Sequence, residues 1–216
     1  MRRLALIHTA LFVAELIKTK MLDTLPALDA FHMVDEGVLK ELMDKREITP
    51  RIVRRLLSMA TFAQETGAEF ILFTCSSTSP AVDLIRPMIG VPLLKIDDPM
   101  AEKAASIGRK IGVICTAETT AGPTTNLIAQ HAKRQAKEVT IEVCVEREAF
   151  ENLKAGRKDL HDALVLDAAV RMAEEVDVIV LAQVSMSHLQ ERLEAILNIP
   201  VISSLGPCLQ ALSSLL

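Results

Sequence analysis

The chain has 216 residues with a formal net charge of −4, and half of its residues are hydrophobic. This length suits one large domain or two small ones, each with an aliphatic core. The acidic balance argues against a protein that binds a phosphate backbone, and the absence of Trp and Tyr argues against base-stacking surfaces. No nucleic-acid partner is therefore expected.

The four cysteines are widely spaced and form neither a disulfide framework nor a CxxC pair, so no metal site is expected. The first fifteen residues imitate a signal peptide, but His8 and Glu15 interrupt the apolar run and no cleavage site follows. No apolar stretch reaches membrane-spanning length. We expect an unprocessed, cytoplasmic protein with no membrane partner.

Short apolar runs without alternation predict strands of a parallel sheet, which helices cover on both faces. The predicted strands cover residues 4–7, 31–34, 70–73, 91–96, 111–115, 177–181 and 199–202. Helices are expected over 10–25, from Pro50 to Gly67, over 101–107 and over 164–173. Thr49 and Pro50 make a strong helix start, because a hydroxyl N-cap precedes a proline at the first helical position.

The second half of the chain repeats the pattern of the first. The distance from Cys75 to Gln183 is 108 positions, and so is the distance from Pro92 to Pro200. The segment His8-Thr9-Ala10 likewise has an echo in Cys115-Thr116-Ala117. Matches in the same order at nearly one offset indicate an internal duplication.

The duplication predicts an α/β protein of two pseudo-symmetric, flavodoxin-like lobes, each a parallel sheet flanked by helices. The predicted lobes are residues 1–106 and 107–216, with the assignment of the C-terminal segment left open. Ligands of parallel sheets bind beyond the carboxyl ends of the strands. We therefore expect a site in a cleft between the lobes, lined by the turns at 8–9, 75–78, 115–116 and 183–185.

The most informative stretch is Phe70 to Pro80, FILFTCSSTSP, where a predicted central strand ends in Cys75 and a run of hydroxyl residues. Hydroxyl and backbone N–H groups at such a turn suit an anion, especially a carboxylate. The thiol adds a nucleophile or proton carrier, whereas the alternative is that Cys75 is a buried small hydrophobe. No Gly-rich turn follows the first strand, and Ala81 stands where a cysteine phosphatase needs arginine.

Across essentially its whole length the sequence resembles the aspartate/glutamate/hydantoin racemase superfamily, which also contains maleate isomerase and arylmalonate decarboxylase. The first-lobe pattern of a cysteine followed by small hydroxyl residues is matched by Cys75-Ser76-Ser77. The strand and turn that open the second lobe are matched by 111–116, with Thr119 three residues further on. The second-lobe cysteine is absent, and Gln183 stands in its place.

The resemblance implies proton transfer without a cofactor, at the carbon next to the carboxylate of a small substrate, in a homodimer. Racemisation in this family uses two thiols on opposite faces of that carbon, and Gln183 cannot exchange protons near neutral pH. We therefore expect a racemase- or isomerase-like enzyme with one thiol. A decarboxylase or lyase and a non-catalytic carboxylate-binding protein stay open as alternatives.

The predicted catalytic residues are Cys75 and, as a second proton carrier at the end of the first strand, His8. The remaining site residues are expected to bind the substrate through hydroxyl, amide and backbone N–H groups. They are Thr9, Ser76, Ser77, Thr78, Thr116, Thr119, Gln183, Val184 and Ser185.

Overall fold

The computed structural model describes residues 2–215, which form two compact units. The first unit contains residues 2–96 together with 209–215, and the second contains 97–208. The predicted boundary lies at 106, whereas residues 97–106 belong to the second unit by their contacts. No helix within the described chain is long and apolar enough to cross a membrane.

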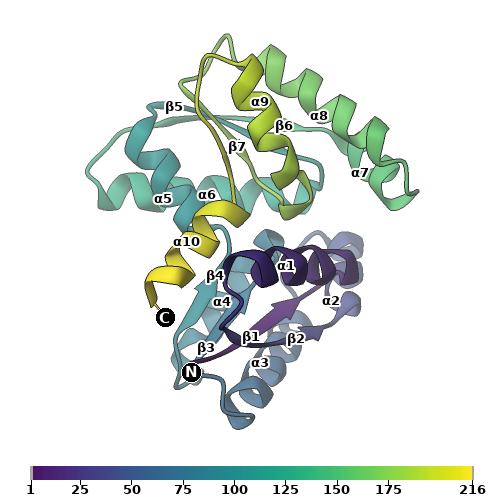
Figure 1. The fold of residues 1–216 in the computed structure, drawn as a ribbon, viewed down its shortest axis with the longest axis vertical. Helices are drawn as coiled ribbons and strands as arrows, with labels where there is room; N and C mark the ends of the chain where they lie inside the picture. Colours follow the sequence, from purple (N-terminus) through teal and green to yellow (C-terminus); the bar gives the residue numbers. More distant parts are fainter. Residues whose placement is uncertain (1, 216) are drawn as a thin grey trace. The chain divides into compact units, whose positions relative to one another are not determined.

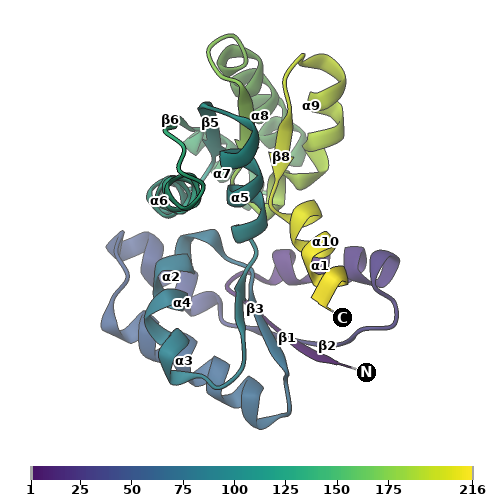
Figure 2. The ribbon, with the colours of Figure 1, turned by 90° about the vertical axis from the view of Figure 1, so that its left-hand side faces the viewer.

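The first unit is a four-stranded parallel sheet in the order β2-β1-β3-β4. Figure 2 shows β1 between β2 and β3. Its strands are β1 (Arg3–His8), β2 (Asp29–Val34), β3 (Phe70–Phe73) and β4 (Leu93–Lys95). Its helices are α1 (Leu11–Thr24), α2 (Glu36–Lys45), α3 (Pro50–Glu65), η1 (Ser76–Thr78), α4 (Ser79–Ile85) and η2 (Arg86–Met88).

The second unit repeats this topology with the order β6-β5-β7-β8. Its strands are β5 (Lys110–Cys115), β6 (Thr140–Val145), β7 (Val178–Leu181) and β8 (Val201–Ser203). Its helices are α5 (Asp98–Ile107), α6 (Glu118–Arg134), α7 (Arg147–Lys154), α8 (Lys158–Met172), η3 (Val184–Leu189) and α9 (Gln190–Ile196). Helix α10 (Leu205–Leu215) begins in this unit and ends in the first.

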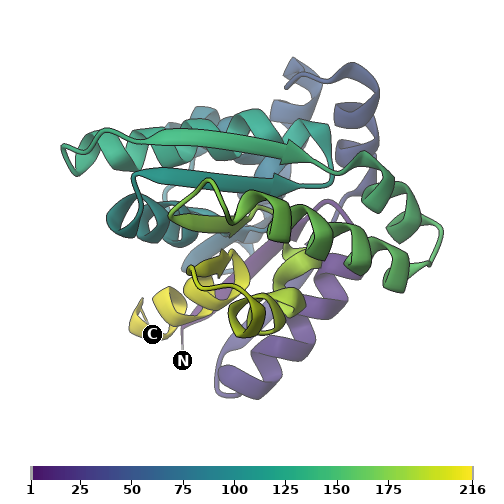
Figure 3. The same ribbon diagram turned by 90° about the horizontal axis from the view of Figure 1, so that it is seen from above.

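Each sheet buries both faces, as the continuous apolar strands require. In the first unit, Ile7, Ile71 and Phe73 pack against α2, α3 and α4, while α1 contacts the other face at β1 and β2. In the second unit, α5 and α6 cover one face and α7, α8 and α9 lie on the other, as Figure 1 shows. Figure 3 shows β5 and β6 side by side in this unit.

The hydrogen bonds confirm the predicted equivalence of the two halves. The N–H of Ile71 donates to the carbonyl of Pro92 (3.0 Å), and the N–H of Ile179 donates to the carbonyl of Pro200 (3.0 Å). Cys75 follows β3 and Gln183 follows β7, which are the third strands of the two units. The two residues therefore occupy matching positions in the same topology.

All seven predicted strands exist, with modest differences in length. The predicted strand at 91–96 is shorter, because Pro92 has no N–H to donate and only Leu93–Lys95 pair as a strand. Helix α5 begins three residues before the predicted 101, and α8 begins at Lys158 rather than 164. Strand β6 was not predicted, because this edge strand is only half-buried and carries Glu142 among its apolar residues.

The start of α3 matches the sequence prediction and makes a further contact. The Thr49 hydroxyl accepts from the N–H of Ile52 (3.2 Å) and lies 2.6 Å from Oε1 of Glu41, to which it donates. Arg51 also donates to Glu41 (2.6 Å). One hydroxyl therefore caps α3 and ties it to α2.

Replacing Thr49 by alanine is expected to lower the free energy of unfolding by about 1 kcal/mol, because the first turn of α3 loses its cap. Urea denaturation followed by circular dichroism measures the loss. Thr49→Ser keeps the hydroxyl and is the control. Equal stabilities of the alanine variant and the unaltered protein would show that the cap is not needed.

Candidate active site

Cys75 lies at the carboxyl end of β3 with its side chain half-buried, and η1 begins at the next residue. The Cys75 carbonyl accepts from the N–H (3.1 Å) and the hydroxyl (2.9 Å) of Thr78, which closes the turn. Ser76, Ser77 and Thr78 are all buried. The predicted cluster of a thiol and three hydroxyl residues is thus assembled at the edge where parallel sheets bind ligands.

The second unit shows what the matching turn binds. The amide oxygen of Gln183 accepts from the N–H of Thr116 (2.5 Å), the N–H of Ala117 (3.1 Å) and the Thr116 hydroxyl (3.1 Å). These donors precede α6, where N–H groups lack partners inside the helix. Three donors that converge on one oxygen form an oxyanion-type site, and a side-chain carbonyl of the protein fills it.

The first unit has the same donors without the same acceptor. Thr9 and Ala10 follow β1 as Thr116 and Ala117 follow β5, and Ala10 has an extended backbone like Ala117. Within residues 2–215, the backbone hydrogen bonds of the turns, loops and caps include none that the N–H groups of Thr9 and Ala10 donate. Cys75 holds the position of Gln183, and its side chain carries no carbonyl. These two N–H groups are therefore available to a ligand.

A negatively charged side chain lies next to the turn of Thr9 and Ala10. The next N–H, that of Leu11, donates to Oε1 of Glu36 at 3.2 Å. A carboxylate near Thr9 and Ala10 would therefore lie close to one negative side chain, which repels it.

His8 is fully buried, with both ring nitrogens in hydrogen-bond distance of a neighbour. Its Nδ1 lies 2.8 Å from the Thr74 hydroxyl, and its Nε2 lies 2.9 Å from Nδ1 of His32. The Thr74 hydroxyl also lies 3.2 Å from the carbonyl oxygen of Ile7, an acceptor for its proton. Burial, and then the charge of His32, lowers the pKa of His8 to about 3, so His8 is neutral at physiological pH.

The other three cysteines are poor nucleophiles. Burial raises the pKa of Cys115 and of Cys208 to about 12. The pKa of Cys144 is also raised, first by burial and then by its hydrogen bond to Glu146. Because the thiolate is the reactive form, these thiols stay protonated and largely inert near neutral pH.

The remaining predicted residues lie near the end of β7 and the start of α6. Val184 and Ser185 are buried in η3, and the Ser185 hydroxyl has no hydrogen-bond partner within the described chain. Thr119 is half-buried in the first turn of α6. These residues lie on the two segments that Gln183 connects through its hydrogen bonds. Their contact with a substrate stays a prediction.

Sequence reasoning missed the partners of the predicted residues. His32, on β2, completes the contact with His8. The parallel register of β1 and β2 brings the two histidines together, although 24 positions separate them. The missing signal was the pairing of the strands, which composition does not reveal.

The profile of the Asp/Glu/Hydantoin racemase family matches residues 23–210 of the chain. The chain belongs to this family. Membership supports a racemase- or isomerase-like function. No curated protein sequence is detectably similar to the chain.

Solved structures share the fold of this racemase family member at low sequence identity. The Picrophilus torridus aspartate racemase has a TM-score of 0.76 and 14% identity, with 99% of this chain and 94% of that chain covered. The allantoin racemase from Klebsiella pneumoniae has a TM-score of 0.73 and 17% identity, with coverages of 100% and 87%. Unliganded arylmalonate decarboxylase has a TM-score of 0.62 and 14% identity, with coverages of 100% and 93%.

We expect iodoacetamide at neutral pH to alkylate Cys75 faster than the other three cysteines. The reason is that Cys115 and Cys208 are buried and that all three have raised pKa values. Peptide mass spectrometry over time measures each rate, and Cys75→Ser is the control that removes the fast phase. Faster labelling of Cys144 would contradict the assignment.

Proposed function

We propose that the protein is a cofactor-independent enzyme of the racemase and isomerase type, which acts at the carbon next to a carboxylate through Cys75. The observation that carries the proposal is the pair of open N–H groups at Thr9 and Ala10, beside the half-buried thiol. The matching donors in the second unit bind the carbonyl oxygen of Gln183.

The proposal assigns the substrate carboxylate to the turn of Thr9 and Ala10. A carboxylate oxygen resembles an amide oxygen as an acceptor, and its negative charge strengthens the bonds that it accepts from N–H groups. Thr9 carries the same hydroxyl as Thr116, which donates to Gln183. The hydroxyls of Ser76, Ser77 and Thr78 are assigned to the same substrate. Substrate contacts of Thr116, Thr119, Val184 and Ser185, which lie in the second unit, stay predictions.

Cys75 is proposed to move the proton. As a thiolate it takes the proton from the α-carbon, and the electron pair of the C–H bond passes into the carboxylate as an enediolate. The N–H groups that bind the carboxylate stabilise the charge that develops there. The same thiol returns a proton to the carbon, so no cofactor is needed.

Gln183, at the matching position of the second unit, supplies no second proton carrier. Its amide does not take up or release a proton near neutral pH, and its oxygen is already bonded to three donors. The thiol therefore returns the proton to the face from which it came. The predicted role of His8 as a second proton carrier stays a prediction. Its buried contact with Thr74 supports another role, in which His8 holds the end of β3 in place just before Cys75.

Decarboxylation is a second candidate, because one proton donor is enough for it. The bond to the departing carboxylate breaks, its electron pair stays on the carbon as an enediolate, and the Cys75 thiol protonates that carbon on one face. The single available thiol is the observation that favours this reaction.

We expect exchange of the α-proton with deuterium in heavy water without loss of configuration. The substrates to test are aspartate, glutamate and 2-phenylpropionate, with proton NMR for exchange and polarimetry for configuration. Cys75→Ala should abolish the exchange, and Cys144→Ala, which removes a thiol outside the site, is the control. Exchange that survives Cys75→Ala would overturn the assignment. Carbon dioxide release from phenylmalonate tests the second candidate.

Racemisation of aspartate and glutamate by the unaltered protein is expected to be negligible, because loss of one acid–base partner typically costs about 10²–10⁴-fold in rate. Gln183→Cys restores a thiol at the second position and should increase racemisation. Gln183→Ser opens the same turn without a thiol and is the matched control. Rapid racemisation by the unaltered protein, measured by circular dichroism, would show that another group is the second base.

A further inference from the structure

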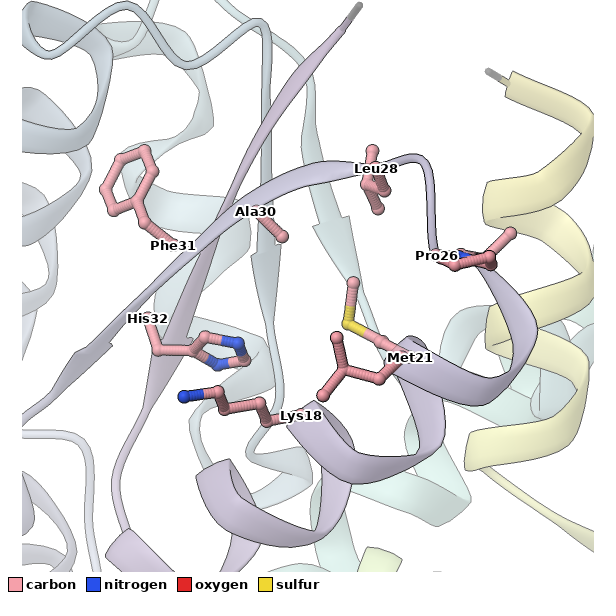
Figure 4. Close-up of a pocket in the computed structure, with 9 residues that line it drawn as sticks. Lys18, Met21, Pro26, Leu28, Ala30, Phe31 and His32 are labelled. Atoms are coloured by element: carbon pink, nitrogen blue, oxygen red, sulfur yellow. The ribbon is translucent and has the colours of Figure 1, made fainter.

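A cavity of about 400 Å³ lies in the first unit between α1, the loop that follows it and the edge strand β2. Figure 4 shows this pocket with Lys18, Met21, Leu28, Ala30 and His32 around it. Its volume falls within the range of about 300–1,000 Å³ that is typical of small-molecule sites. The proposed reaction at Cys75 does not use it.

Apolar side chains form about half of the wall of this pocket. Met21, Leu22, Leu25, Pro26, Leu28 and Ala30 contribute to the lining. Leu22 is 63% exposed, although it lies on the wall of a cavity, so its apolar surface is only partly covered by the protein. An apolar ligand group that covered this wall would remove that surface from water, which is favourable.

The polar end of the pocket is positive. Lys18 and His32 both line it, and Figure 4 shows their nitrogen-bearing ends next to each other. Burial lowers the pKa of His32, and the charge of Lys18 lowers it further. Within residues 2–215, no acidic side chain forms an ion pair with Lys18. Two adjacent basic groups without an acid are complementary to an anion.

The hydrogen bonds behind His32 fix the way in which it meets a ligand. Its Nδ1 lies 2.9 Å from Nε2 of His8, and Nδ1 of His8 lies 2.8 Å from the Thr74 hydroxyl, so Nδ1 of His32 is occupied by a contact inside the protein. The Nε2 atom of His32 is thus the nitrogen left to gain a proton. The chain holds the ring in place, and a proton on Nε2 gives the pocket a second N–H donor beside Lys18.

We propose that this pocket binds a small monocarboxylate with an apolar tail, with the carboxylate on Lys18 and His32 and the tail against Met21, Leu22 and Leu28. Two donors match the two oxygens of a carboxylate, whereas a phosphate dianion would keep oxygens without donors. A cation would meet the like charge of Lys18. A neutral apolar molecule would gain no charge interaction with the exposed ammonium of Lys18.

The test is titration of the full chain with hexanoate, followed by NMR of carbon-13-labelled methionine methyl groups and by calorimetry. Met21→Leu assigns the signal of Met21, which lines the pocket. We expect hexanoate to shift this signal with saturation. Hexanol, which lacks the charge, and inorganic phosphate, which lacks the tail, should shift it at least about tenfold less effectively. Equal effects of hexanol and hexanoate would overturn the proposal.

Lys18→Met keeps the length of the side chain and removes its charge, and we expect binding about three- to tenfold weaker. Lys20→Met is the matched control on the same helix, because Lys20 is exposed and does not line the pocket. Leu22→Glu places an anion at the wall and should abolish the shift. Unchanged affinity in both Lys18→Met and Leu22→Glu would place hexanoate elsewhere.

The affinity should rise as the pH falls below about 6.5, because burial and Lys18 lower the pKa of His32 from that ordinary value and only the protonated ring pairs with the carboxylate. His8 and Lys18 face His32 and keep their charge states over this range, since His8 has a pKa of about 3 and lysine stays protonated. Thr9→Val, which alters the proposed active site, should leave the Met21 shift unchanged. Loss of the shift in Thr9→Val would assign hexanoate to the active site instead and overturn this second site.

Discussion

The backbone N–H groups that precede the first helix of each unit dominate the chemistry of this protein, because a helix start leaves donors that need an acceptor. In the second unit Gln183 supplies that acceptor from the end of the third strand. In the first unit the matching residue is Cys75, and the donors at Thr9 and Ala10 stay open. Each unit therefore has N–H donors at the same place in its topology. The side chain at position 75 or 183 determines whether the protein itself or a ligand accepts from them.

The reactive side chains of this protein lie at the ends of its strands, outside the pairing of the sheets. Cys75 is half-buried at the edge of its sheet, whereas the other thiols are held in the protonated form by their surroundings. His8 and Cys115 occupy the matching last positions of β1 and β5 and are both fully buried. Burial by the surrounding helices and strands therefore limits the reactivity of both residues, although both side chains can carry a proton.

Much of this arrangement follows from local sequence patterns. The apolar run before Cys75, the cap at Thr49 and the repeat at 108 positions predicted the strands, a helix start and the duplication. Strand β6 escaped prediction because its pattern is only half apolar. The bonds of Gln183 and the contact between His8 and His32 depend on rotamers and on strand pairing, so the one-dimensional pattern does not contain them.

The matching positions of Cys75 and Gln183 bear on how this architecture diversifies. Both residues stand just beyond the last paired residue of a central strand, and neither belongs to the buried apolar clusters of its unit. A substitution there leaves the core packing intact, so its cost in stability is small compared with a change inside the sheet. A duplicated unit can thus acquire a new reactive group, or lose one, through a single codon while the scaffold continues to fold.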